Sequence, residues 1–491
     1  MSAIPRTMRR SGAALALAIA VLLTLSTASL AFAASNSLTL LRISKDPYTN
    51  TSSQHKTQVE PDTFSYGNTE VSVFQSGRFS DGGSSNIGFA TSTNNGSTWT
   101  SGFLPDTTIY ATPAGKFQRV SDASVAYDAK HNTWVVSYLG LTNGGNAPVD
   151  VASSHSTDGG LTWSNPVSIN SSGDFNDKNW SVCDDTSTSK YYGNCYTEYD
   201  DNSLGDAERM STSTDGGQTW STGIAPAGNP TGLGGQPVVQ PNGTVIVPFE
   251  DLNGTISDFM STNGGSSWTS PVTIASIDVH YESGNIRTSP LPSAEIDGSG
   301  TVYVAWQDCR FESGCSANDI VFSTSSDGKT WSTVKRVPSN PVGSGVDHFI
   351  PGIAVDKSTS GSSAHVAVTY YYFSNTTCSS NCKLYVGYIS SVNGGSTWSK
   401  SKQLAGPMNL SWLASTNQGN MVGDYISTSI TSTGRAFPVI AVAKAPKGTM
   451  FHESMFTMSG GLAVKGGTIP SSAVVVDYGH VPAFGRSTTA F

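Results

Sequence analysis

The chain is 491 residues long, only 13% of its residues are charged, and its formal net charge is -9. A net acidic chain without a basic cluster argues against nucleic acid and anionic membrane surfaces as partners. The 51 glycines indicate many tight turns instead of long helices, and the length fits either two or three average domains or one larger domain.

Residues 1–34 have the pattern of a secretory signal peptide. Three arginines precede an apolar run at 12–30, and Ala31-Phe32-Ala33 follows as the small-x-small pattern of a signal-peptidase site. An uncleaved N-terminal anchor is the alternative, because the apolar run is long for a signal peptide. We expect cleavage, and hence a secreted protein whose mature part, 35–491, is a single domain without a membrane segment.

A short phrase recurs along the rest of the chain. It reads Ser-x-Asp/Asn-x-Gly-x-Thr/Ser-Trp, and consecutive closing tryptophans are 48 to 67 residues apart. Such a quasi-regular period marks an array of similar structural units. The copies, of which the fifth is one residue shorter, lie at 92–99, 156–163, 213–220, 261–268, 325–331 and 391–398.

Each copy of this box follows an alternating strand pattern and precedes a short strand, which predicts that the box occupies a hairpin turn. The Asp or Asn oxygen can accept nearby backbone N–H groups, glycine supplies positive φ, and tryptophan buries a large ring against neighbouring strands. Because Asn replaces Asp at positions 94, 263 and 393, the turn needs an acceptor and not a negative charge. The boxes are therefore predicted to be scaffold and not catalytic groups.

The boxes resemble the Asp-box repeats of the sialidase superfamily, and the resemblance covers nearly the whole mature chain. It implies an all-β fold, a β-propeller built from four-stranded antiparallel blades. The superfamily also includes other glycosidases, lyases, receptors and assembly factors, so the boxes do not by themselves imply sialidase activity.

The strand pattern predicts six boxed blades, with innermost strands expected at 61–66, 122–127, 179–182, 236–239, 291–296 and 349–355. Three strands without a box follow, at 424–430, 436–442 and 450–456. A strand at 38–43 is expected to complete them as a seventh blade, which would join both chain ends in one sheet and remove exposed edges. Six blades, as in the familiar sialidase propeller, is the alternative.

The six cysteines fall into three close pairs, which is typical of local disulfides in an exported protein. We expect the bonds Cys183–Cys195, Cys309–Cys315 and Cys378–Cys382. A metal site is the alternative, but no pair has a companion His or Cys at ligand spacing. Asp200-Asp201-Asn202 offers oxygens to Ca²⁺, yet without the rest of a loop pattern it is better explained as a solvated turn. The sequence predicts no metal and no cofactor.

Charged residues gather where the predicted innermost strands begin and where the second strands end, at the face opposite the boxes. This predicts a polar pocket, although a solvated rim is the alternative for any single residue. The set comprises Glu60, Asp62, Arg78, Arg119, Asp122, Asp177, Lys178, Glu198, Asp200, Asp201, Glu250, Asp251, Arg287, Asp308, Arg310, Asp347, His348 and Asp424.

The resemblance implies three arginines that hold a substrate carboxylate, a tyrosine nucleophile with a glutamate partner, and an aspartate acid/base. The substrate-binding candidates are Arg78, Arg119, Arg287, Arg310, Asp308 and Asp424. The catalytic candidates are Tyr425 as nucleophile with Glu282 or Glu250 as its partner, Asp62 as acid/base, and His348 as the general base of a lyase or a non-sialic glycosidase.

Two observations favour other interpretations. The Phe-Arg-Ile-Pro motif of sialidases is absent, and the corresponding stretch reads Val59-Glu-Pro-Asp62. Asp308 and Arg310 flank Cys309, so that they are also placed to pair with each other.

The sequence thus supports two functional hypotheses. The first is a secreted, monomeric glycoside hydrolase that acts exo-wise on an acidic sugar of an extracellular glycan, either sialic or uronic acid, with a polysaccharide lyase as a variant. The second is a non-catalytic propeller that binds carbohydrate or protein.

Overall fold

The computed structural model describes residues 38–379 and 381–472, together with Met1. The predicted signal peptide at 1–34 lies outside these described residues apart from Met1. The described part is all-β, as predicted. Its helical segments are the short 3-10 turns η1 (Asn202–Leu204), η2 (Ser313–Cys315), η3 (Gly361–Ser363) and η4 (Leu410–Trp412).

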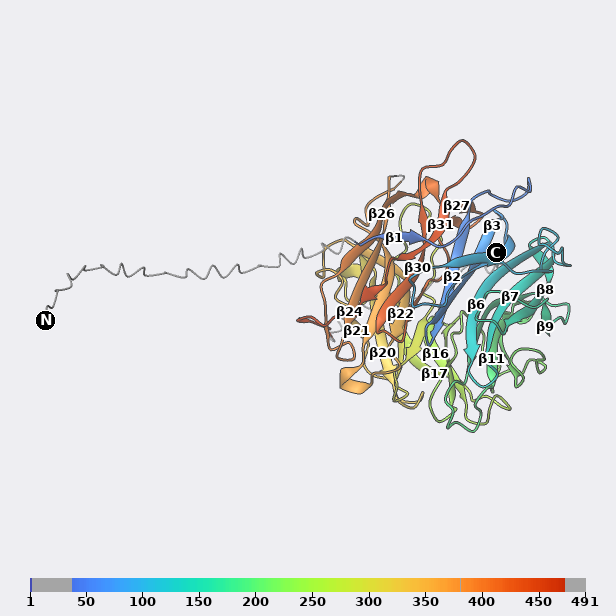
Figure 1. Cartoon of the computed structure of the whole chain (residues 1–491), viewed down its shortest axis with the longest axis horizontal. Coiled ribbons are helices and arrows are strands. Elements are labelled where there is room, and N and C mark those ends of the chain that lie inside the picture. Colours follow the sequence, from blue (N-terminus) through green and yellow to red (C-terminus); the bar gives the residue numbers. More distant parts are fainter. Residues whose placement is uncertain (2–37, 380, 473–491) are drawn as a thin grey trace. The chain divides into compact units, whose positions relative to one another are not determined.

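The strands form antiparallel sheets that follow one another along the chain (Figure 1). The first sheet contains β2 (Gln58–Tyr66), β3 (Thr69–Arg78), β4 (Ser84–Ser92) and β5 (Thr100–Phe103). The second contains β6 (Arg119–Asp128), β7 (Thr133–Asn143), β8 (Asn146–Ser156) and β9 (Val167–Asn170), and it is joined to the first by one pairing of Ser84 with Val120.

The middle of the chain forms three further sheets. The third contains β10 (Asn176–Cys183), β11 (Cys195–Asp201) and β12 (Ala207–Ser213). The fourth contains β14 (Val238–Val239), β15 (Val245–Asp251), β16 (Thr255–Ser261) and β17 (Val272–Ser276), with β13 (Gly232–Leu233) also paired to β15. The fifth contains β18 (Ser293–Ile296), β19 (Val302–Asp308), β20 (Asp319–Ser325) and β21 (Lys335–Arg336).

Two larger sheets and two short pairs complete the described part. The sixth sheet contains β22 (Asp347–Val355), β23 (Val366–Phe373), β24 (Lys383–Ser391) and β26 (Lys402–Asn409). The last contains β29 (Ser427–Ile430), β30 (Arg435–Ala443), β31 (Glu453–Met458) and β1 (Leu40–Arg42), with β32 (Leu462–Ala463) paired to β30. The short pairs are β25 (Thr397–Trp398) with β33 (Ile469–Pro470), and β27 (Ala414–Thr416) with β28 (Gly419–Met421).

The N-terminal strand belongs to the last sheet. β1 runs antiparallel to β31, with Leu40 opposite Met458 and Arg42 opposite Phe456. The predicted pairing of the segment at 38–43 with the strands after the last box is therefore confirmed, and it covers an edge of β31 that would otherwise be exposed.

The first strand of each sheet contacts the first strand of the next. β2 contacts β6, and the contacts continue through β10, β14, β18, β22 and β29, which in turn contacts β2. A narrow cavity of about 40 Å³ lies among these strands and is lined by residues from all seven of them. The first strands therefore follow one another in a closed order around a common cavity.

The boxes form hairpin turns with the expected hydrogen bonds. In the box at 156–163, the N–H of Gly160 donates to Ser156 Oγ (2.9 Å) and the N–H of Thr162 donates to Asp158 Oδ1 (3.0 Å). In the box at 92–99, the N–H of Thr98 donates in the same way to Asn94 Oδ1 (2.9 Å). The turn therefore uses the side-chain oxygen as an acceptor whether or not the residue carries a charge, as predicted.

The tryptophan that closes each box packs against the preceding sheet. The ring of Trp163 lies 5.9 Å from that of Phe89 on β4, and the ring of Trp398 lies 5.8 Å from that of Phe322 on β20. Trp331 instead donates through Nε1 to Asp258 on β16 (2.9 Å). The boxes thus fasten successive sheets to each other, which is the scaffold role that their composition predicted.

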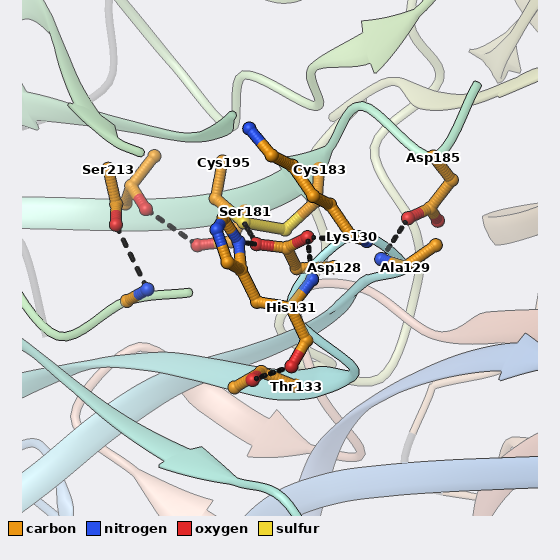
Figure 2. Close-up of a disulfide and its surroundings, with 12 residues drawn as sticks. Asp128, Ala129, Lys130, His131, Thr133, Ser181, Cys183, Asp185, Cys195 and Ser213 are labelled. Atoms are coloured by element: carbon orange, nitrogen blue, oxygen red, sulfur yellow. Dashed lines mark hydrogen bonds and ion pairs between the residues drawn. A yellow bond between two sulfur atoms is a disulfide. The ribbon is translucent and has the colours of Figure 1, made fainter. Parts of the chain in front are cut away.

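All three predicted disulfides are present. Cys183 and Cys195 are opposite each other on β10 and β11 and lie beside the pair formed by Asp128 and His131, whose Oδ2 and Nδ1 are 2.5 Å apart (Figure 2). No helix within the described ranges is both long and apolar enough to cross a membrane.

Candidate functional site

Four of the first strands contain a β-bulge near their beginning. The pairing register shifts in β2, β6, β10 and β22, and each bulge holds one non-glycine residue with positive φ, namely Glu60 (55°), Asp122 (46°), Lys178 (45°) and Ile350 (50°). A bulge re-aims the side chain of its extra residue. Positive φ is rare outside glycine and costs on the order of 1–3 kcal/mol, and it persists mainly at functional sites. Three of these four strained residues are charged, and all are buried.

Lys178 joins carboxylates from three strands or their approaches. Its Nζ lies 3.1 Å from Asp122 Oδ1, 2.8 Å from Asp424 Oδ2 and 3.7 Å from Glu60 Oε1. The side chain of Lys178 is 9% exposed and that of Glu60 is 1% exposed. The ammonium group is therefore largely removed from water, and the protein's own acids compensate for the lost hydration.

Arg287 binds the same aspartate through a planar fork. Its Nε donates to Asp424 Oδ1 (2.7 Å), and its Nη2 donates to Asp424 Oδ2. Burial acts to raise the pKa of Asp424, but Arg287 and Lys178 outweigh it and hold that pKa well below its usual range. Asp424 is therefore a permanent anion between two cations.

Arg78 joins this group from β3 and is 1% exposed. Its Nη1 donates to Gln75 Oε1 (3.3 Å) and to the carbonyl oxygen of Gly83 (3.0 Å), while Nε2 of Gln75 donates to Glu60 Oε2. Burial lowers the pKa of Arg78, and the nearby Glu60 opposes this effect. We call the seven residues Glu60, Arg78, Asp122, Asp177, Lys178, Arg287 and Asp424 the charged cluster.

Two acids of the charged cluster titrate near neutral pH. Burial, reinforced by Asp122, raises the pKa of Glu60 to about 7, with Lys178 acting in the opposite direction. The same causes raise the pKa of Asp177 to about 7. When both are protonated, the three cations of the cluster face only the carboxylates of Asp122 and Asp424. The cluster then carries one surplus positive charge, which suits a single bound anion.

Tyr425 lies against the cluster but has no base. Its ring is 5.2 Å from Lys178 Nζ and meets the ring of Trp180 edge-on at 5.0 Å. Its hydroxyl is buried without a hydrogen-bond partner among the described residues. Burial raises the pKa of Tyr425 well above its ordinary value, and the carboxylates of Asp122 and Glu60 add to the effect. In this geometry Tyr425 is not activated as a nucleophile.

Asp62 lines the cavity among the first strands. Its Oδ2 accepts the N–H of Val125 (2.8 Å) and its Oδ1 accepts the N–H of Thr63 (2.7 Å). Burial raises the pKa of Asp62 to about 7 in spite of these hydrogen bonds. Asp62 is thus a carboxylic acid that can hold a proton near neutral pH beside an internal cavity.

Glu282 is held by polar side chains. Its Oε2 accepts a hydrogen bond from Thr288 Oγ1 (2.5 Å), and its Oε1 accepts from Gln307 Nε2 (2.7 Å) and Asn318 Nδ2 (2.9 Å). These bonds fix the carboxylate in place. Because the hydroxyl of Tyr425 has no hydrogen-bond partner in residues 38–379 and 381–472, Glu282 and Tyr425 do not form the predicted nucleophile pair in this structure.

The other predicted site residues are placed away from the centre of the cluster or paired locally. Arg119 Nη1 donates to the exposed Asp81 (2.7 Å). Arg310 binds Asp308 through Nε (2.8 Å) and Nη2 (2.7 Å), which is the mutual pairing that the sequence offered as an alternative.

His348 is fully buried between two asparagines. Its Nε2 lies 2.9 Å from Asn340 Oδ1 and its Nδ1 lies 3.1 Å from the carbonyl oxygen of Asn318. Burial lowers the pKa of His348 to about 3. A neutral imidazole with both nitrogens occupied is structural, so the geometry provides no support for a lyase base at this position.

A second group of acids lies beside the cluster on β11 and β12. Glu198, Asp200 and Glu208 are completely buried, and their carboxyl oxygens find no donor among the described residues apart from the proton that Glu198 and Glu208 can share. Burial raises the pKa of Glu198 and Asp200 well above their ordinary values and that of Glu208 to about 8. In the described ranges, no three His, Cys, Asp or Glu residues are arranged to hold a metal ion.

The sequence placed Glu60, Asp122, Asp177 and Lys178 at the predicted pocket but did not assign them roles. What three of these residues share is a position that only the pairing register of the strands reveals. When the first strands are aligned, Glu60, Asp122 and Lys178 each stand two residues before the point where regular pairing resumes, at Asp62, Ser124 and Trp180.

No family model matches the chain, and no curated protein matches it. Among solved structures it is similar to sialidases. A leech intramolecular trans-sialidase is 12% identical, with a TM-score of 0.45 over 67% of this chain and 67% of that chain. A sialidase of Trypanosoma rangeli is 11% identical, with a TM-score of 0.45 over 86% of this chain and 58% of that chain. A protein of unknown function from Dyadobacter fermentans is 16% identical, with a TM-score of 0.45 over 72% of this chain and 99% of that chain.

Proposed function

We propose that residues 35–491 are one seven-bladed β-propeller domain of a secreted protein. The closed order of contacts among the seven first strands and the pairing of β1 with β31 support this arrangement. Three local disulfides are in keeping with an oxidising compartment. In such a ring, the charged cluster stands at one end of the central cavity and the boxes at the other.

We further propose that the protein is a glycan-active enzyme, an exo-acting glycoside hydrolase whose substrate carries a carboxylate, as sialic and uronic acids do. The observation that carries this proposal is the gathering of three largely buried cations, Arg78, Lys178 and Arg287, in one cluster, where Asp424 contacts both Lys178 and Arg287. Guanidinium groups grip carboxylates through paired, charge-assisted hydrogen bonds. The strained bulges that aim Lys178 and its partners inward add support, since such strain is seldom retained without a function.

Hydrolysis also needs a proton donor for the leaving group. Glu60 belongs to the cluster, Asp62 lies two residues further along β2, and burial raises the pKa of each to about 7. A carboxylic acid with such a pKa holds its proton at working pH and yet releases it readily, which is the property of a general acid. We assign this role to Glu60 or Asp62 and the binding of the sugar carboxylate to the cations.

A second candidate function is binding without catalysis. It is favoured by the fork between Arg287 and Asp424, which occupies one arginine, and by the lack of a base at the hydroxyl of Tyr425 within the described part of the chain. A protein of this kind would recognise the acidic sugar and release it unchanged.

Turnover and binding have to be measured separately to decide between them. The full-length secreted protein is incubated with fluorogenic sialosides and uronides, and its affinity for the free acids is measured by titration calorimetry. Turnover that is lost in both Glu60→Gln and Lys178→Met supports the hydrolase. Binding that is lost in Lys178→Met, without product from any substrate, supports the second candidate. A protein that neither binds nor cleaves an acidic sugar would contradict both.

A further inference from the structure

A second cavity lies at the opposite end of the first strands. It has a volume of about 230 Å³ and is lined by residues 64–67, Glu295, 354–358 and 428–432. These segments are the ends of β2, β22 and β29 and the turns that follow them, whereas the charged cluster stands where the first strands begin. Glu60 and Tyr66 are six residues apart on β2, which corresponds to about 20 Å at the rise of a β-strand. The second cavity therefore lies at the other end of the first strands from the charged cluster, while Phe64, Glu295 and Lys357 also line the narrow cavity between them.

One wall of this cavity is aromatic and firmly placed. Tyr66 is 42% exposed, and its ring lies 4.3 Å from that of the buried Tyr127 at an angle of 31°. Phe64 lines the same cavity, and the ammonium of Lys357 lies 4.9 Å from its ring centre. An aromatic ring that is backed by another ring but open on its outer side offers apolar area without a large entropic cost on binding.

The remaining wall presents groups of both charges. Lys357 and Glu295 both line the cavity, and Lys357 is exposed. Asp356 also lines it, but its Oδ1 is taken by the N–H and hydroxyl of Ser358 (2.9 and 2.6 Å). Asp185 is the further acid that interacts electrostatically with Lys357, and its Oδ1 accepts the N–H of Ala129 (2.8 Å) (Figure 2). Lys357 interacts electrostatically with both Glu295 and Asp185, so these charges compensate one another within the wall. The wall is left with hydrogen-bond donors and acceptors for a neutral ligand.

We propose that this cavity binds one neutral sugar residue, with the ring packed against Tyr66 and hydroxyl groups bonded to Lys357 and Glu295. The volume of the cavity agrees with this ligand. Pockets for drug-sized molecules have about 300–1,000 Å³, and a single sugar residue, which is smaller than such a molecule, needs a smaller cavity like this one. The ammonium of Lys357 can donate a hydrogen bond to one sugar hydroxyl, and the carboxylate of Glu295 can accept one from a neighbouring hydroxyl. The protein would then hold a glycan at two places, through an acidic residue at the cluster and a neutral residue here.

The test uses ligand-observed NMR and calorimetry on the full-length secreted protein, with the methyl glycosides of glucose, galactose, mannose and N-acetylglucosamine as probes. At least one probe should bind with a Kd on the order of 1 mM, as expected for a monosaccharide-sized ligand. Tyr66→Ala should weaken that binding about tenfold or more, and Lys357→Met should weaken it as well, whereas Tyr66→Phe keeps the ring and should change it about threefold at most.

Tyr281→Ala is the matched control, because Tyr281 is 60% exposed and does not line this cavity. It should leave binding of the neutral probe unchanged. Unchanged thermal unfolding of the variants shows that a loss of binding is not a loss of folding. The proposal is overturned if none of the neutral probes binds, or if their binding survives Tyr66→Ala and Lys357→Met. Either result can occur while the acidic-sugar site remains intact, so the two proposals fail independently.

Discussion

The ammonium of Lys178 lies 2.8 Å from Oδ2 of Asp424, although the two residues are 246 positions apart in the chain. The bond connects the beginning of β10 with the segment that leads into β29. It also places the only lysine of the charged cluster between two of its acids, since Asp122 is 3.1 Å away on the other side. Much of what we expect of this protein follows from this arrangement.

Lys178→Met should destabilise the fold by about 3–5 kcal/mol, because it removes the counter-ion of the buried Asp122 and one of the two counter-ions of Asp424. Urea unfolding at pH 7 followed by tryptophan fluorescence measures the loss. Lys400→Met, which removes an exposed lysine, is the control and should change the free energy of unfolding by no more than about 0.5 kcal/mol. Equal stability of Lys178→Met and the unmodified protein would show that the cluster is hydrated and not a buried ion network.

Binding of an acidic sugar should weaken as the pH rises through about 7. The pKa of Glu60 and that of Asp177 are both raised to about 7, so both acids lose their protons there and turn the single surplus positive charge of the cluster into a single surplus negative charge. Calorimetric titrations from pH 5.5 to 8.5 measure this dependence, with the interval chosen to span about one and a half pH units on either side of that pKa. In Glu60→Gln, which cannot ionise at this position, the dependence should become shallower. An affinity that increases with pH would contradict the assignment.

The buried acids on β11 and β12 should make the protein less stable as the pH rises. The pKa of Glu208 is raised from its ordinary value of 4.5 to about 8 in the folded state, so the folded protein binds more protons than the unfolded chain between these two values. The stability that protonated Glu208 contributes to the folded state is fully present below pH 4.5. As the pH rises above this value, one such acid lowers the free energy of unfolding by about 1.4 kcal/mol for each pH unit.

Glu208→Gln should therefore raise the melting temperature at pH 8 relative to the unmodified protein and have little effect at pH 4. Thermal unfolding at both values provides the comparison. Asp158→Asn is a useful control because Asp158 lies in an exposed turn and has its pKa lowered to about 2 by hydrogen bonds from Thr162, against the opposing effect of burial. A melting temperature that increases from pH 5 to pH 8 in the unmodified protein, and not in Glu208→Gln, would reverse the expected sign.

The box turns should tolerate Asn in place of Asp but not Ala. Asn94 makes the backbone contact that Asp158 makes, so Asp158→Asn should preserve the turn. Asp158→Ala removes the carboxylate that accepts hydrogen bonds from the N–H groups of Leu161 and Thr162 and from the hydroxyl of Thr162. This substitution should lower the free energy of unfolding by about 1–2 kcal/mol. Chemical denaturation of the two variants tests this order, which would be refuted if both lost the same stability.

The tryptophans of the boxes should contribute according to their burial. Trp398 is 0% exposed and donates through Nε1 to Gly395 O (3.0 Å) and Ser471 Oγ (2.8 Å), so Trp398→Ala should cost about 3–5 kcal/mol. Trp99 is only partly buried, and Trp99→Ala should cost clearly less. If the two substitutions had equal effects on urea unfolding, the packing of box tryptophans between sheets would not explain their recurrence.

The sequence by itself determined the local architecture. The box at 156–163 could be recognised as a hairpin turn because its hydrogen bonds join residues within four positions of each other, so that residue type and spacing encode them directly. The same holds for Cys183 with Cys195, twelve positions apart, and for the alternating strands. The pairing of β1 with β31 was also predictable, since the three strands after the last box are one strand short of a four-stranded sheet.

Only the tertiary structure decided which charges meet. Arg287 could be selected as a candidate, but its engagement by Asp424 depends on two segments 137 positions apart. Bulges aim Glu60, Asp122 and Lys178 inward, and a bulge is visible only where two strands fall out of register. For the same reason Tyr425 was a plausible nucleophile in the sequence, while no base lies at its hydroxyl among the residues that the structure describes. Local hydrogen bonds are determined by neighbouring residues, whereas the electrostatics of a buried cluster depends on distances that only the assembled sheets establish.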